Sequence, residues 1–79
     1  MQDTKTKLVI TDYQPGERYD TVARTFEGLG VGETMEITND HDIRPLLEVK
    51  LLQDFPNQYY WEYIEEGPKV FRAVITKKQ

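Results

Sequence analysis

The absence of cysteine constrains this 79-residue chain more than any other feature of its sequence. Very small domains often depend on disulfides or on thiolate-bound metals, and this chain can form neither. Its fold must therefore be held together by a packed apolar core, and 38% of its residues are hydrophobic. The length suits one domain, so we expect residues 1–79 to form a single domain with its core over about 7–77.

Charge and hydropathy argue against several classes of function. The formal net charge is −4 and the basic residues are scattered, whereas general nucleic-acid binding requires a positive surface. No apolar run approaches the ~20 residues that span a bilayer, and the first residues carry no signal-peptide pattern. We therefore expect a cytoplasmic protein that binds neither nucleic acid nor membranes.

Two segments have the apolar spacing of amphipathic helices. In the first, over about 15–29, Pro15 suits the first turn and glycines suit the end. Its apolar face consists of Tyr19, Val22, Ala23, Phe26 and Leu29. The second helix is expected over about 44–55. Its buried stripe is expected to contain Leu47, Leu51, Leu52 and Phe55, widened by Leu46 and Val49.

The segment between these helices has the period-two alternation of a strand, over residues 33–38. The alternation predicts that Met35 and Ile37 face the core. It also predicts that Glu36 and Thr38 face water.

Three further segments have β character. Lys7–Asp12 is rich in β-branched residues and precedes a turn, and residues 59–65 and 70–76 flank Glu66-Gly67-Pro68 as in an antiparallel hairpin. The resulting order is β-α-β-α-β-β. We expect an α/β (α+β) two-layer sandwich, in which two helices cover one face of a four-stranded mixed sheet.

Several segments resemble the domain of unknown function 2249 family. The specific part is the run Asn-Asp-His-Asp-Ile-Arg-Pro-Leu-Leu over residues 39–47, and the similarity extends from Lys7 to Lys77. Supporting segments are Glu17–Tyr19, Trp61–Tyr63, Glu65–Pro68 and Arg72–Thr76. The resemblance implies the TusA/SirA-like fold of bacterial sulfur carriers, whose element order is the one expected above.

The chain departs from these relatives at two positions. Sulfur carriers of the TusA type have a Cys-Pro pair where the first helix begins, whereas Pro15-Gly16 stands there in this sequence, so a sulfur carrier is disfavoured. Tyr19 stands where the family commonly has a histidine. Some family members occur beside hemerythrin-like and nitrogen-oxide-related proteins. The resemblance therefore implies a redox or nitrogen-oxide setting, with a hemerythrin-like or redox protein as a possible partner.

The densest group of reactive side chains lies just before the second helix and consists of Asn39, Asp40, His41, Asp42 and Arg44. The favoured interpretation is a helix-capping loop. A second interpretation is a ligand site, in which His41 and Arg44 converge on a small anionic or polar group. A third is a divalent metal bound by one imidazole and two carboxylates, for which adjacent residues are a weak signal.

Neither catalysis nor a cofactor is predicted. The chain contains no serine, so an Asp-His pair has no serine nucleophile to activate. The aromatic and acidic hairpin instead suggests a protein-contact surface, for which we expect Tyr60, Glu62, Glu65 and Glu66. The sequence therefore predicts a non-enzymatic protein-interaction or accessory module, with ligand or metal binding by Asn39–Arg44 as the alternative.

Overall fold

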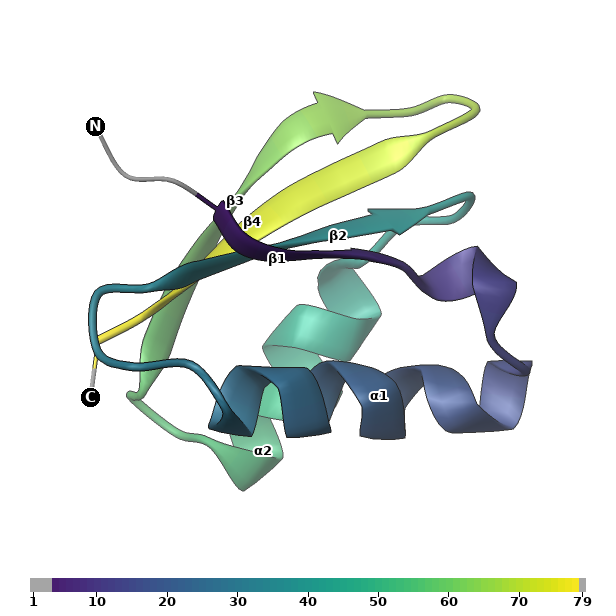
Figure 1. The fold of residues 1–79 in the computed structure, drawn as a ribbon. Helices are drawn as coiled ribbons and strands as arrows, with labels where there is room; N and C mark the ends of the chain where they lie inside the picture. Colours follow the sequence, from purple (N-terminus) through teal and green to yellow (C-terminus); the bar gives the residue numbers. More distant parts are fainter. Residues whose placement is uncertain (1–3, 79) are drawn as a thin grey trace.

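The computed structural model describes residues 4–78 and contains a four-stranded sheet with helices on one face (Figure 1). The elements along the chain are β1 (Thr4–Val9), the 3-10 turn η1 (Ile10–Asp12), α1 (Pro15–Glu27), β2 (Thr34–Asn39), the π-helical segment η2 (Leu46–Lys50), α2 (Leu51–Asp54), β3 (Tyr59–Glu66) and β4 (Phe71–Lys77). Within residues 4–78, no helix has both the length and the hydropathy needed to cross a membrane.

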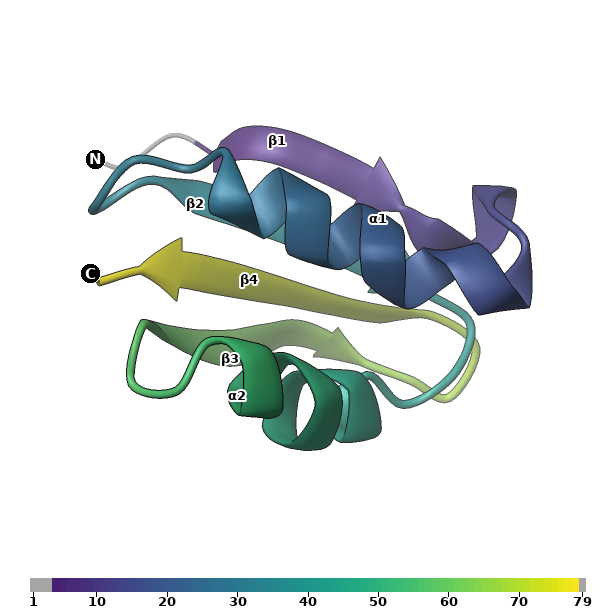
Figure 2. The same ribbon diagram turned by 90° about the horizontal axis from the view of Figure 1, so that it is seen from below.

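The sheet has the strand order β1-β2-β4-β3. The β1–β2 pair is parallel, and β4 is antiparallel to both of its neighbours. Figure 2 shows α1 running along the β1–β2 half and α2 on the β3 side, with both helices on the same face. The predicted mixed sheet and two-layer α+β architecture are confirmed.

The first helix begins at Pro15 and ends at Glu27, two residues earlier than predicted, where the Gly28 N–H bonds to the Arg24 carbonyl oxygen. Its inward face buries Val22 and Phe26 completely. These side chains belong to an apolar cluster between the helices and the sheet. The cluster contains Ile10, Val22, Phe26, Leu29, Met35, Ile37, Ile43, Leu47, Leu51, Tyr59, Ala73 and Ile75. The predicted core is therefore formed largely as the periodicity indicated.

The second helix contains a π turn, and this turn corrects the predicted buried stripe. The Leu51 N–H bonds to the Leu46 carbonyl oxygen, five residues back. A wider turn keeps residues four apart on one face, so the buried positions are Ile43, Leu47 and Leu51. The prediction that Leu52 and Val49 are buried was wrong: their exposed fractions are 47% and 54%.

The π turn also explains the hydrogen bond made by Tyr59. In an α-helix the Leu51 N–H would bond to the Leu47 carbonyl oxygen. Here that N–H bonds to the Leu46 carbonyl oxygen instead. The buried Tyr59 hydroxyl donates to the Leu47 carbonyl oxygen in its place. A side chain from β3 thus anchors the second helix to the sheet.

The first strand lies earlier in the chain than the predicted Lys7–Asp12. It pairs with β2 through Val9, and the chain then enters a 3-10 turn closed by the Tyr13 N–H on the Ile10 carbonyl oxygen. This turn carries Ile10 into the core, where it is fully buried. The β-branched run alone could not distinguish a core residue in a strand from one in the following turn.

Glu36 does not face water as predicted. It points to the face without helices, but its exposed fraction is only 7%, because β2 is an inner strand and the Arg72 side chain of β4 bonds to it. Arg72 Nε and Nη2 lie 3.1 and 3.0 Å from Glu36 Oε2. Thr38, predicted to face water as well, is half-buried.

Candidate functional site

The loop between β2 and the second helix holds the predicted ligand residues at different depths. Asn39 is the last residue of β2, opposite Phe71, and its side-chain oxygen is buried without a hydrogen-bond partner among the described residues. Asp40 and His41 lie on the outside of the loop. The His41 side chain is 78% exposed, and its Nδ1 lies 2.5 Å from Asp40 Oδ1.

Asp42 closes the start of the second helix. Its Oδ1 accepts the Arg44 N–H at 3.0 Å and the hydroxyl of Tyr63 from β3. The same hydroxyl accepts the Ile43 N–H at 2.8 Å. The hydrogen bonds that Asp42 accepts from the Tyr63 hydroxyl and, to a smaller extent, from the Arg44 N–H favour its charged form. They lower the pKa of the Asp42 carboxyl below its ordinary value. Asp42 is therefore the capping residue of this loop, in agreement with the favoured interpretation.

Arg44 turns away from the loop and toward the hairpin. Its Nη2 lies 2.5 Å from Glu66 Oε2, and its Nη1 lies 4.0 Å from Asp42 Oδ2. The guanidinium carbon lies 5.5 Å from the centre of the Tyr63 ring. The structure thus joins two residues predicted for a ligand site with one predicted for a partner surface, and their charges satisfy each other. His41 takes no part in these contacts.

Tyr19 of α1 also anchors the second helix. Its hydroxyl donates to Asp54 Oδ2 and lies 3.1 Å from the Lys50 carbonyl oxygen. Burial and the bond to Asp54 raise the pKa of Tyr19. The second helix is therefore held by tyrosine hydroxyls at its start, middle and end, from Tyr63, Tyr59 and Tyr19.

In the part of the chain that the structure describes, no three His, Asp or Glu side chains are placed so that they could hold a metal ion together. Asp40 and His41 pair with each other, whereas Asp42 bonds to Tyr63 of β3. A local run of possible ligands is not enough when neighbouring side chains point in different directions.

Within residues 4–78, no helix covers the sheet face opposite α1 and α2 (Figures 1 and 2). Cross-strand neighbours share a face. The register therefore places on it Lys7 and Val9 of β1, Thr34, Glu36 and Thr38 of β2, Arg72, Val74 and Thr76 of β4, and Tyr60 and Glu62 of β3. Ile64, the inserted residue of a β3 bulge, continues the alternation after Glu62. We call these residues the open sheet face.

The open sheet face combines apolar side chains with an acidic edge. The exposed fractions of Val9, Tyr60 and Ile64 are 44%, 58% and 49%. Of the predicted partner residues, Tyr60 and Glu62 lie on this face, and Glu65 is 3.7 Å from Arg72 at its margin. Glu66 is instead bonded to Arg44.

The strand that carries Lys7 and Val9 was predicted, but these two residues were not included in the predicted partner surface. The signal was available, since Leu8 alternates with them and packs on the core. Their nearness to the hairpin residues, however, depends on the strand order, which local patterns do not contain.

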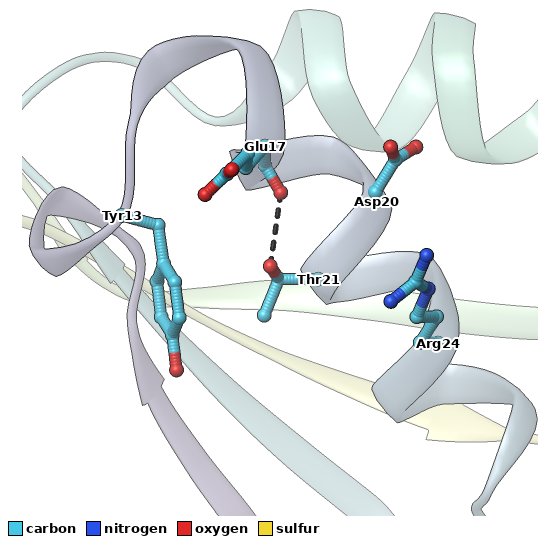
Figure 3. A pocket seen from close by; sticks show the side chains of 5 residues that line it. All are labelled: Tyr13, Glu17, Asp20, Thr21 and Arg24. Atoms are coloured by element: carbon cyan, nitrogen blue, oxygen red, sulfur yellow. Dashed lines mark hydrogen bonds between the residues drawn. The ribbon is translucent and has the colours of Figure 1, made fainter.

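A shallow hollow lies along α1 (Figure 3). The ring of Tyr13 forms one wall, and Asp20 and Arg24 project from the helix on the other side. The Thr21 hydroxyl donates to the Glu17 carbonyl oxygen at 2.9 Å. The hollow is open to solvent and lined by charges of both signs, so it does not define an enclosed binding site.

These features define a small α+β sandwich whose charged loop pairs with itself and with β3, and whose sheet has one open face. The chain belongs to the family described as "Uncharacterized conserved protein (DUF2249)", whose model matches residues 8–77. The predicted family is therefore confirmed. No match is found among curated proteins or among solved structures, and the likeness to TusA-type proteins stays a prediction.

The lowered pKa of Asp42 predicts an acid-sensitive loop. Because this pKa is lower in the folded chain than in the unfolded chain, the unfolded chain takes up more protons as the pH falls. The stabilisation is complete above the ordinary Asp pKa of about 3.9 and is lost as the pH falls through the lower folded value. We expect the urea midpoint of Asp42→Asn to depend less steeply on pH in this range. By NMR, Tyr63→Phe should move the Asp42 titration to higher pH, and an identical titration in both proteins would contradict the cap.

Proposed function

We propose that this protein is a non-catalytic protein-interaction module that binds through its open sheet face. The observation that carries the proposal is the exposure of Val9, Tyr60 and Ile64 on one uncovered sheet surface. Val9 lies at the β1 edge of this face, and Tyr60 and Ile64 lie at its β3 edge. Exposed apolar side chains on one face, interspersed with charged ones, are typical of protein contacts. The acidic β3 edge favours a partner surface that places basic side chains against it.

The sheet edges are less suited to binding than the face. The β1–β2 register shifts between Thr4 and Thr6, and the β3–β4 register shifts between Tyr63 and Glu65. Bulges and edge charges such as Glu62 are devices that oppose strand addition. The proposal is therefore contact over the face and not extension of the sheet.

The alternative proposal, ligand or metal binding by Asn39–Arg44, has less support. Asp42 and Arg44 already pair with Tyr63 and Glu66, so a ligand would have to displace existing charged contacts. His41 is exposed and separate from Arg44 in these contacts. The family resemblance alone supports a redox or nitrogen-oxide setting with a hemerythrin-like or redox partner. The proposed cytoplasmic location is supported by sequence features alone.

Site-specific photo-crosslinking tests the proposed surface. A benzophenone amino acid at Tyr60 should give a discrete protein adduct in cells that naturally make this protein. The matched control is the same group at Gln53, which is exposed on the helix side and should give none. Intact mass identifies the partner: an adduct of twice 9.3 kDa is a second copy, and another mass is a different protein. Equal labelling from both positions, or none from position 60, would contradict the proposal.

A further inference from the structure

The two edges of the open sheet face carry opposite charges. Lys7 of β1 pairs with Glu36, Glu36 with Val74, and Val74 with Glu62 of β3, so Lys7 and Glu62 end the same row across the sheet. Three strand spacings of about 4.8 Å separate them by roughly 14 Å. Both side chains are exposed, and no ion pair among the described residues involves either one.

The neighbouring row has an exposed apolar side chain at each edge, Val9 on β1 and Ile64 on β3, and Glu65 lies beside Ile64. Val9 pairs with Thr38, Thr38 with Arg72, and Arg72 lies opposite Glu65 at the bulge that exposes Ile64. The face therefore presents a lysine and a valine at the β1 edge. At the β3 edge it presents a glutamate and an isoleucine at matching heights.

A twofold axis parallel to the strands makes this surface complementary to itself. Such an axis exchanges the edges, so that β1 of one copy lies over β3 of the other, as in aligned sheet packing. Lys7 then faces Glu62 of the second copy, Val9 faces Ile64, and each contact occurs twice. An axis across the strands would instead set Lys7 against Lys7 and Glu62 against Glu62, which is repulsive.

We propose that the open sheet face binds a second copy of this chain, face to face, with β1 over β3. This inference rests on the proposed function, because it names the partner of the same surface. Four strands and about six residues give a face of roughly 20 by 20 Å, or about 400 Å². Standard interfaces bury about 800 Å² per partner, so the dimer is weak and reversible.

Charge reversal tests the pairing. Sedimentation equilibrium up to about 1 mM should detect the wild-type dimer, and Lys7→Glu and Glu62→Lys should each weaken it at least about tenfold, since each creates two like-charge contacts. An equimolar mixture of the two variants should recover the wild-type affinity, because both contacts in the mixed dimer again join opposite charges. The double variant Lys7→Glu/Glu62→Lys should recover it as well.

Controls separate this pairing from a change in net charge. Lys50→Glu and Glu48→Lys make the same charge changes on the helix side and should leave the dimer unchanged. If a reversal prevents folding, as judged by circular dichroism, Lys7→Gln and Glu62→Gln should each weaken the dimer by a smaller factor. A wild-type protein that is monomeric at about 1 mM, or a mixture that does not recover, would overturn the dimer. A crosslink from position 60 to a different protein would then still support the proposed function.

Discussion

Replacing Phe26 with alanine should lower the free energy of unfolding by about 3–5 kcal/mol, the largest single effect expected in this chain. Phe26 is fully buried, and its ring centre lies 4.9 Å from that of Phe55 and 5.6 Å from that of Tyr59. It therefore joins α1 to the end of the second helix and to β3. Small domains have total stabilities near the low end of about 5–15 kcal/mol, so the variant should be partly unfolded. Urea unfolding followed by circular dichroism measures the loss.

Tyr13→Ala is the control for the Phe26 substitution. Tyr13 is also aromatic, but its side chain is 39% exposed at the turn before α1. Its removal should change the stability by no more than about 0.5 kcal/mol. Equal effects at the two positions would show that the core does not centre on Phe26.

Tyr59→Phe should destabilise the protein by about 1–3 kcal/mol, because it leaves the Leu47 carbonyl without the hydroxyl that now bonds to it. The ring remains, so the loss reports the hydrogen bond and not the packing. Loss of the anchor should be greatest around the π turn, and hydrogen exchange of the Leu51 amide should quicken more than that of Val22 in α1.

The adjacent residue provides a matched control for Tyr59→Phe. Tyr60 is 58% exposed on the opposite face of β3, and its hydroxyl has no partner among the hydrogen bonds of the described residues. Tyr60→Phe should leave the urea midpoint unchanged. If the two variants lose equal stability, the proposed anchoring of the second helix is wrong.

The elements that the sequence predicted well are those whose structure is set by local pattern. The apolar face of α1 and the alternation through Met35 and Ile37 each reach the core as expected. The second helix was predicted in extent but not in its buried face. The Leu51 N–H bonds to the Leu46 carbonyl oxygen, five residues back, and this wider turn shifts the buried face. The Leu47 carbonyl oxygen then accepts the hydroxyl of Tyr59, a residue of β3. Such a distant contact leaves no local periodic signal.

In the candidate sites as well, local pattern predicted single residues but not their contacts with distant elements. Asp42 could be predicted as a cap from its place before the helix, whereas its bond to Tyr63 joins residues 21 positions apart. The open sheet face depends on the strand order, which brings Lys7 into one row with Glu62. Side-chain periodicity shows which residues share a face of one strand, but not which strands are neighbours.

The central claim is that the open sheet face is the surface through which this protein binds. A concentration series of two-dimensional amide NMR spectra tests it most directly, with the helix residues of the same molecule as internal controls. We predict shifts concentrated at Lys7, Val9, Tyr60 and Glu62, and steady positions for exposed α1 residues such as Asp20. Shifts that gather instead on the helices or at His41 would contradict the claim. So would a spectrum that changes neither with concentration nor on addition of a protein that was crosslinked at position 60.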